Sequence, residues 1–149
     1  MQGNIAFLAT DVGRLFRKRF DMASRDFGVT GSQWRVLIAV DRMPGINQGA
    51  LAACLDVEAI TVGRMIDRLE KLGMVERRPD PADRRAWRLY LTPSAAPLMD
   101  KLLACGADLL AEAVAGFDEA DHAQLVALLQ RVRANLLADI PAEVGALNG

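Results

Sequence analysis

The sequence is poor in the residues that most enzymes and metal sites require. Its 149 residues include one histidine, His122, and two cysteines, Cys54 and Cys105, which stand far apart and form no C-x-x-C pair. A structural zinc site needs clustered cysteine and histidine ligands, and a histidine-dependent catalytic centre needs a nucleophile nearby. The sequence also lacks a glycine-rich phosphate-binding loop. We therefore expect a protein that is not an enzyme and that holds no metal and no cofactor.

Long apolar runs are missing as well. No stretch approaches the roughly 18 apolar residues that span a membrane, and the first residues lack a signal-peptide pattern. Two isolated cysteines fit a reducing compartment, where buried helical cysteines are more often inert than redox-sensing. We expect a cytoplasmic protein without a membrane partner. With 52% hydrophobic residues, the chain is long enough to bury one core, and residues 1–149 are predicted to form one domain.

Charge is distributed unevenly along the chain. The net charge is −1, but residues 64–88 carry eight Lys and Arg against five Asp and Glu, whereas residues 101–149 carry three against seven. A locally basic segment beside an acidic one is typical of a surface that binds nucleic acid. A solvated helix followed by a hairpin would produce the same counts, so charge alone leaves both interpretations open.

The segment from 48 to 92 carries the most informative pattern. Leu51 and Leu55 predict a short helix over 48–55, and the next three residues form a turn. A longer helix is predicted over 59–72, ended by Gly73 at the position that favours a left-handed residue. Its buried stripe should consist of four residues at helical spacing: Val62, Ile66, Leu69 and Leu72.

After Gly73 the hydrophobic period changes from helical to alternating. Strands are predicted over 74–78 and 87–91, with Trp87, Leu89 and Leu91 on a half-buried side of the second strand. Two prolines and two aspartates make residues 79–85 a loop. The segment is therefore a helix-turn-helix followed by a hairpin with a basic tip, which is a wing.

The side of the longer helix outside the buried stripe is exposed and basic. Two helices joined by a tight turn, the second exposed, have the geometry of a major-groove reader, in which arginine donates paired hydrogen bonds to guanine. Arg64 is the first candidate for a base contact; an intrahelical ion pair with Glu58 or Asp67 is the alternative. The full exposed set is Ala59, Ile60, Thr61, Arg64 and Arg68.

The flanking segments are helical. A first helix is predicted over 4–26 with one broad buried face, and Thr30 and Gln33 form a capping box for a second helix that ends near 42. Beyond the wing, Thr92 is expected to cap a helix that runs to about 115, and another helix ends near 138. The terminal helices carry more apolar face than one small domain covers, so a second copy is expected to cover it. The alternative is packing on the wing domain of the same chain.

The run from Leu55 to Thr92 resembles the winged helix of the MarR/SlyA transcription regulators. The matching pieces are the wing triplet 83–85 (Asp-Arg-Arg), the helix core 64–70, the run 73–77 and the exit 91–93 (Leu-Thr-Pro). The resemblance covers nearly the whole chain. It implies a mainly α fold with a small β-hairpin wing. The DNA-binding unit would span about 30–92, the dimerisation helices about 4–26 and 93–138, and a flexible tail 141–149.

That resemblance implies a homodimer acting on an inverted repeat in double-stranded DNA. Arg68 should touch phosphate, Gln48 should anchor to the DNA backbone, and Arg84 and Arg85 should reach phosphates or the minor groove from the wing tip. Asp83 is expected to be structural, accepting from the Arg85 side chain or from loop amides. The competing hypothesis is a winged helix that binds another protein.

Members of that family often release DNA when a small aromatic or lipophilic acid binds near the junction of the terminal helices and the winged domain. The matching region here offers Arg17, Phe20 and Trp34. An arginine beside aromatic rings can hold a carboxylate. Trp34 as an ordinary core residue is the alternative.

Overall fold

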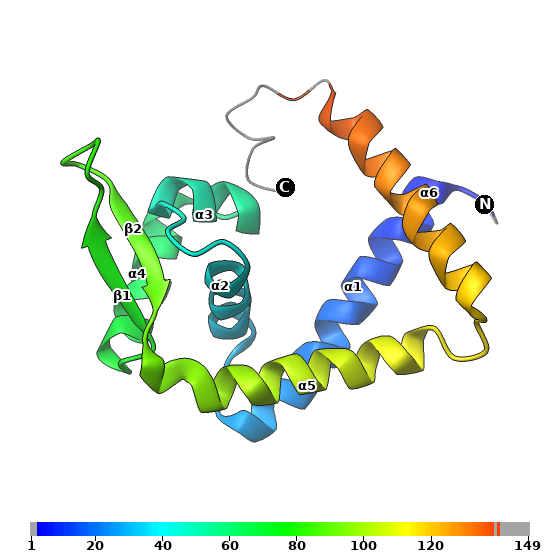
Figure 1. Cartoon of the computed structure of the whole chain (residues 1–149), viewed down its shortest axis with the longest axis horizontal. Coiled ribbons are helices and arrows are strands. Elements are labelled where there is room, and N and C mark those ends of the chain that lie inside the picture. The colour runs from blue at the N-terminus through cyan, green and yellow to red at the C-terminus, as the bar shows by residue number, and fades with distance from the viewer. Residues whose placement is uncertain (1–2, 139, 141–149) are drawn as a thin grey trace.

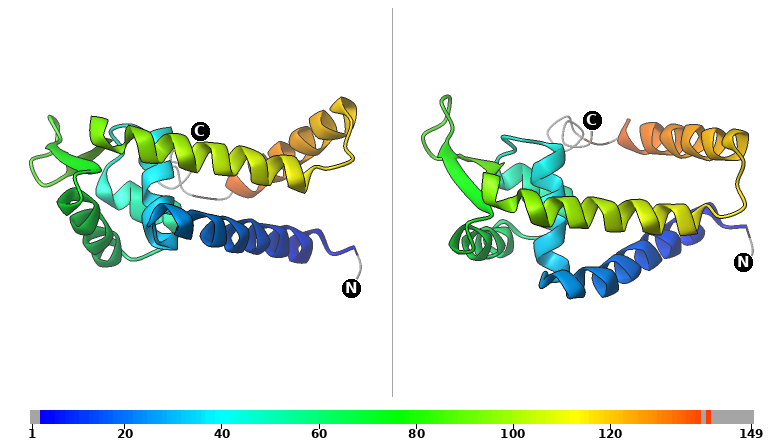
Figure 2. Two further views of the ribbon diagram at one scale, coloured as in Figure 1. Left: turned by 90° about the horizontal axis from the view of Figure 1, so that it is seen from below. Right: turned by 60° about the horizontal axis from the view of Figure 1, so that its bottom comes forward.

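The computed structural model describes residues 3–138 and 140 and is mainly helical (Figures 1 and 2). Within them no helix is long and apolar enough to cross a membrane. Two 3₁₀ turns, Arg25–Phe27 and Pro93–Ala95, join longer elements. These elements are, in chain order, α1 (Ile5–Ser24), α2 (Gly31–Arg42), α3 (Gln48–Leu55), α4 (Ala59–Lys71), β1 (Val75–Pro79), β2 (Trp87–Leu91), α5 (Ala96–Ala113) and α6 (Glu119–Leu137).

The helix-turn-helix has the predicted bounds because its ends are fixed by local chemistry. The Asn47 side chain accepts from the Ala50 amide at 2.7 Å and so caps α3. Asp56 ends α3 in a left-handed conformation, with φ of 53°, and Gly73 follows α4 with φ of 71°. The capping box of Thr30 and Gln33 at the start of α2 is also present. These signals act within a few residues and are therefore readable from sequence.

The core lies where α2, α3, α4, the base of the wing and the first half of α5 meet. Three members of the predicted α4 stripe, Val62, Ile66 and Leu69, are buried there. The fourth prediction was wrong: Leu72 is 59% exposed. Helix α4 ends at Lys71, so Leu72 is the C-cap, and the chain turns at Gly73 before Leu72 can continue the stripe.

The wing is an antiparallel pair, with Val75 opposite Leu91 and Pro79 opposite Trp87. It starts one residue later than predicted. The chain just before α3 also pairs with it, because the Leu89 amide donates to the Ile46 carbonyl at 2.9 Å. The prediction of a half-buried side was right at Leu89 and wrong at Trp87, which is 45% exposed because it lies beyond the core.

The terminal helices α1 and α6 differ from this unit. In Figure 1, α1 runs beside α5, and α6 folds back from the far end of α5. This chain alone covers the apolar face of α1 only around Phe20 and Ser24, so the alternative that α1 packs fully on its own winged domain is wrong. Helix α6 has no buried residue in its described length. The large apolar residues left exposed on these two helices are Ile5, Phe7, Leu8, Val12, Leu15, Phe16, Met22, Leu125, Val126, Leu128, Leu129, Val132 and Leu136.

The structure also corrects the expected cap at Thr92 and the expected end of α5. The Thr92 side chain caps no helix; its hydroxyl donates to the Gly73 carbonyl and ties the end of α4 to the exit of the wing. Helix α5 ends at Ala113, two residues before the predicted end. The tail expected from residue 141 onward falls outside the described residues.

Candidate nucleic-acid interface

The predicted DNA-facing residues of α4 are all exposed and lie on the first turn and outer side of the helix. Ile60 is 64% exposed, and its neighbours Ala59 and Thr61 are open as well. Arg64 and Arg68, four residues apart, share one face. The alternative of an ion pair to Glu58 or Asp67 is not realised for Arg64, which has no ion pair within the described part of the chain.

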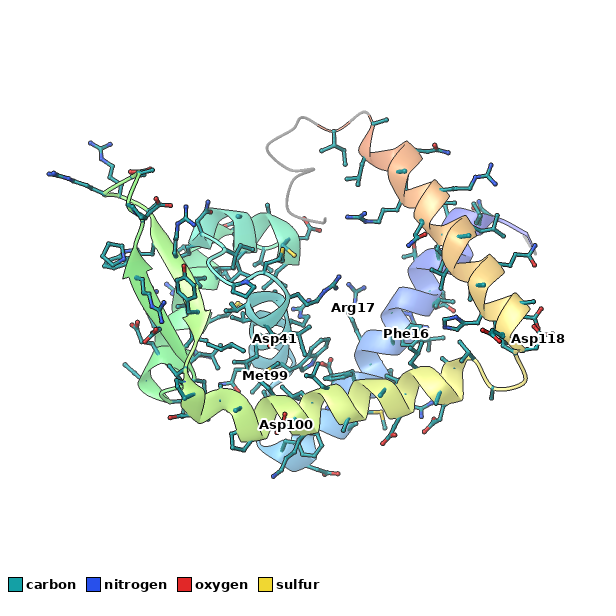
Figure 3. The ribbon with its side chains drawn as sticks, viewed as in Figure 1. Phe16, Arg17, Asp41, Met99, Asp100 and Asp118 are labelled. Atoms are coloured by element: carbon teal, nitrogen blue, oxygen red, sulfur yellow. The ribbon has the colours of Figure 1, made fainter. Side chains whose placement is uncertain are left out.

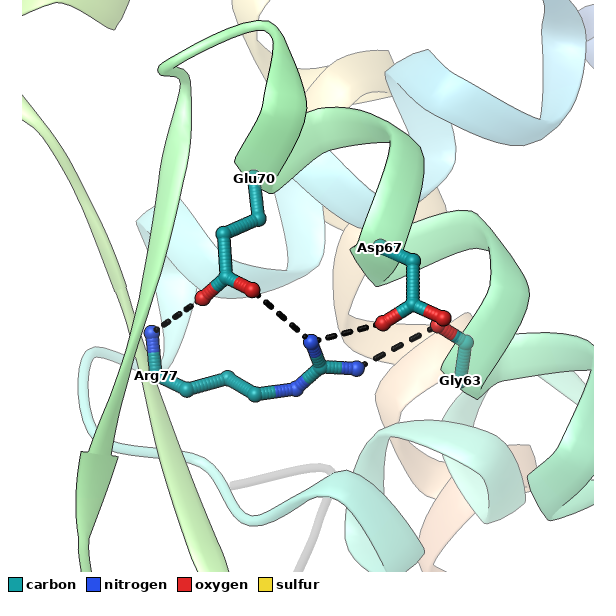
Figure 4. A network of polar contacts seen from close by, with 4 residues as sticks. All are labelled: Gly63, Asp67, Glu70 and Arg77. Carbon is teal, nitrogen blue, oxygen red and sulfur yellow. Dashed lines mark hydrogen bonds and ion pairs between the residues drawn. The ribbon is translucent and has the colours of Figure 1, made fainter.

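Asp67 instead helps to hold an arginine from the wing (Figure 4). The guanidinium of Arg77 on β1 lies 2.7 Å from Asp67 Oδ1 and 3.0 Å from Glu70 Oε1, and donates to the Gly63 carbonyl at 3.3 Å. The backbone amide of Arg77 also donates to Glu70 at 3.3 Å. Because Arg77 is only 16% exposed, these bonds are partly shielded from water. They fix the wing against one flank of α4.

Gly63 has a second role at the same place. A β-carbon at this position would lie 3.0 Å from Nε2 at the end of the Gln48 side chain, so the glycine leaves room for that side chain beside α4. A glycine inside a helix costs about 1 kcal/mol relative to alanine. In return, the glycine leaves space for the Gln48 side chain beside α4. Sequence reasoning gave no role to Gly63, Glu70 or Arg77 and considered Asp67 only as a partner of Arg64, because helical spacing does not reveal which strand residue faces the helix.

Ion pairing removes most of the acidic residues of this region from the charge balance. Asp67 and Glu70 pair with Arg77, Glu76 pairs with Arg78, and Asp80 pairs with Arg88. Arg78 also lies 4.1 Å from the centre of the Tyr90 ring. Across residues 3–138 and 140, five cations of segment 64–88 have no such partner: Arg64, Arg68, Lys71, Arg84 and Arg85. Because Asp67 and Glu70 share the one cation of Arg77, segment 64–88 keeps its net charge of +3, eight cations against five acids, and the positive charge is concentrated on these five side chains.

The wing tip is shaped by two aspartates that accept bonds from its backbone. Asp83 Oδ1 accepts from the Arg85 amide at 2.9 Å, and Asp80 Oδ1 accepts from the Ala82 amide at 2.8 Å. The Ala82 amide, then the Arg88 guanidinium, lower the pKa of Asp80 below its ordinary value, so this carboxylate is charged at neutral pH. The Arg84 and Arg85 side chains stay open to solvent at the tip.

The residues proposed for an effector divide into two groups. Arg17 and Trp34 line a pocket of about 430 Å³ that α1, α2, α3 and α6 enclose, together with Arg35, Arg42, Cys54 and Arg133. Figure 3 shows Arg17 on the side of α1 that faces α2. Phe20 lies outside the pocket, 9% exposed, with its ring centre 4.3 Å from that of Trp34. The Trp34 indole donates to Asp21 at 2.6 Å, so the tryptophan is half core and half pocket wall.

The two cysteines lie apart in different surroundings. Burial, then the charge of Asp108, raises the pKa of the Cys105 thiol, which keeps it protonated and unreactive at neutral pH. Cys54 lines the arginine-rich pocket. Within the described residues, no three His, Cys, Asp or Glu side chains are close enough together to hold a metal ion.

The sequence and the fold are similar to those of known proteins. The sequence profile of the MarR family matches residues 27–86. YybA of Bacillus subtilis, named as an uncharacterized HTH-type transcriptional regulator, is 30% identical over 115 residues, which are 77% of each chain. The crystal structure of the transcriptional regulator PA3341 is similar at 31% identity, with a TM-score of 0.80 over 89% of this chain and 98% of that one.

A protein from Listeria monocytogenes has the same fold at 22% identity. Its TM-score is 0.80 over 93% of this chain and 92% of that chain. It is described as a MarR-family transcriptional regulator and was crystallised with a 26-mer DNA.

Proposed function

The chain belongs to the MarR family of winged helix-turn-helix transcriptional regulators, which are not enzymes, and from this premise we propose that it acts as a homodimer on an inverted repeat in double-stranded DNA. DNA binding follows from the family. The unpaired arginines of α4 and the wing carry the proposal, because a polyanion is the partner that such a surface fits.

The proposed contacts follow the geometry of these two elements. Arg64 reads a base edge in the major groove, with Ala59, Ile60 and Thr61 allowing close approach of the helix. Arg68, one turn further along α4, binds phosphate. Arg84 and Arg85 reach the flanking backbone or minor groove, and Asp83 orients them through the loop. Gln48 contacts the backbone from the start of α3.

We propose a second copy because α1 and α6 each carry an apolar face that this chain leaves exposed. Leu8 on α1 is 63% exposed and Leu136 on α6 is 68% exposed, and both belong to longer apolar stripes. A twofold interface would cover the same face on each chain. Two recognition helices related by that axis would lie about 34 Å apart, one turn of DNA, which makes the operator a short inverted repeat.

A small aromatic or lipophilic acid is the proposed effector. Arg17, with Arg35 and Arg42, gives the pocket a positive wall for a carboxylate, and Trp34 gives it an apolar one. Phe20 would act only by backing the Trp34 ring. A thermal-shift screen of such acids tests this. Stabilisation that is lost in Arg17→Ala is expected, and no shift across a broad panel would overturn the effector proposal.

The main experiment is fluorescence anisotropy on duplex from the upstream region of the gene and on scrambled duplex, across a salt series. We expect binding to the upstream duplex to be about a thousandfold tighter or more, with affinity falling steeply with salt. Weak binding, equal on both duplexes, would instead favour a winged helix that binds another protein.

A further inference from the structure

Trp87 lies on the inner face of the wing, which turns toward α4. Side chains alternate along a strand, so Val75, Arg77 and Pro79 on β1 share this face with Trp87 and Leu89 on β2. Burial falls steadily toward the tip. Val75 and Leu89 are buried in the core and Arg77 is held by α4, whereas Trp87 is 45% exposed. The inner face therefore continues past the core and ends on an uncovered indole.

The indole of Trp87 also has an unused hydrogen-bond donor. The other tryptophan, Trp34, donates its indole N–H to Asp21 at 2.6 Å. The N–H of Trp87 has no acceptor among residues 3–138 and 140. A tryptophan with one open apolar side and a free donor suits a partner that offers both an apolar surface and an acceptor.

Trp87 forms one wall of a cleft between the wing and the helix-turn-helix. Gln48, Glu70 and Arg77 form the other walls, and the cleft has a volume of about 450 Å³. Glu70 and Asp67 share the Arg77 guanidinium, which offsets part of the negative charge that would repel an anion there. The cleft lies between α4, with Arg64 and Arg68, and the wing, with Arg84 and Arg85 at its tip.

We infer that Trp87 is a DNA-contacting residue, packing its ring on a deoxyribose of the backbone beside the recognition helix and donating its N–H to the adjacent phosphate. Sugars give the backbone an apolar edge between phosphates, which matches an indole with a free donor. The unpaired arginines on both sides of the cleft favour a polyanion over an apolar peptide. The inference rests on the proposed DNA-binding function and adds to it a contact that carries no base information.

Tryptophan fluorescence separates this contact from a purely structural role. The chain has two tryptophans, so Trp34→Phe leaves Trp87 as the reporter and Trp87→Phe leaves Trp34. Acrylamide quenching is measured with and without the upstream duplex. We expect DNA to reduce the quenching of Trp87 at least threefold while leaving that of Trp34 nearly unchanged. Unchanged quenching of Trp87 in a saturated complex would overturn the inference.

The DNA affinities of Trp87 variants provide a second test. Trp87→Ala should weaken upstream and scrambled duplex alike by about tenfold, the loss expected when roughly 50 Å² of apolar contact is removed. Trp87→Phe keeps a ring without the donor and should fall in between. Leu72→Ala, an exposed apolar residue at the end of α4, is the control and should change affinity less than twofold.

The two arms also separate this inference from the proposed function. Trp87→Ala binding within twofold of wild type would overturn the contact while leaving DNA recognition intact. If Trp87→Ala does not fold, the quenching of the Trp34→Phe protein still decides. A wild-type chain that binds no duplex would overturn the proposed function and the contact together.

Discussion

The unit formed by α4 and the wing differs from the terminal helices α1 and α6 in how much of its apolar surface one chain buries. The first unit buries most of its apolar stripe within one chain, at Val62, Ile66 and Leu69, and its acids Asp67 and Asp80 pair with arginines of the wing. The terminal helices α1 and α6 leave most of their apolar faces open. The first unit presents a charged surface to other molecules, whereas the exposed apolar faces of α1 and α6 mark an interaction site, which we propose is filled by a second copy of the chain.

The largest expected effect is a loss of dimer affinity when a charge is placed on the exposed apolar face of α6. Leu129→Glu puts a carboxylate on the apolar face of α6, where Leu129 is 52% exposed in one chain. Burying that charge in an interface costs several kcal/mol, so the dimer dissociation constant should rise about 100-fold or more. Sedimentation velocity across protein concentrations measures the shift.

The matched control is Leu72→Glu, because Leu72 is 59% exposed at the end of α4, outside the terminal helices. It should leave the dimer intact. Dimers of equal strength in both variants would show that the face of α6 is not an interface.

The next largest effect is a loss of DNA affinity when arginines on the exposed side of α4 and at the wing tip are removed. Arg64→Ala should cost about 1–3 kcal/mol of binding free energy on the upstream duplex and relax sequence preference, because a base contact is lost. Arg84→Ala should weaken upstream and scrambled duplexes more evenly, because it removes a backbone or groove contact at the tip. Anisotropy on both duplexes at one salt concentration distinguishes them. If the two variants lose the same on both duplexes, the assignment of roles fails.

The Arg77 contacts should matter less than the base contact but more than an ordinary surface ion pair. Arg77→Ala leaves Asp67 and Glu70 without their shared cation and frees the wing from α4. We expect the free energy of unfolding to fall by about 1–2 kcal/mol. Arg78→Ala on the same strand removes a pair with Glu76 in which the arginine is 57% exposed, and should cost about 0.5 kcal/mol. Urea denaturation compares them, and equal losses would mean that Arg77 does not couple wing to helix.

The smallest effect is a pH dependence at the wing tip. The pKa of Asp80 is lowered in the folded state, so the bonds of the charged carboxylate stabilise the fold fully above the ordinary aspartate pKa of about 3.9. That contribution disappears as the pH falls through the lower folded pKa. The stability difference between wild type and Asp80→Asn should therefore be constant from pH 7 to about pH 5 and shrink in more acidic solution. A difference that grows on acidification would contradict the lowered pKa.

Features that depend on neighbouring residues in the chain could be predicted from the sequence. The bounds of α3 and α4 follow from Asn47, Asp56 and Gly73, which act within a few residues of themselves. The exposed side of α4 follows from helical periodicity. These features gave the mainly helical fold with its wing, and they placed the candidate DNA-facing residues on one open surface.

What could not be read depends on which segments meet in space. The partners of Arg77 are set by the packing of β1 against α4, and no spacing in the chain encodes it. The same holds for the Thr92 hydroxyl, which bonds to Gly73 instead of capping a helix. Apolar periodicity predicts that the face of α1 is covered but does not say by which segment or chain, and this chain covers it only around Phe20 and Ser24.

We propose that two chains join through the apolar faces of α1 and α6, and that each chain presents α4 and its wing to the DNA. The most direct test is native mass spectrometry of the protein titrated onto the upstream duplex. We predict a complex of two chains per duplex, without a populated one-chain complex at low protein, and loss of that complex in Leu129→Glu. One chain per duplex at saturation, bound as tightly as wild type in the Leu129→Glu variant, would contradict the account.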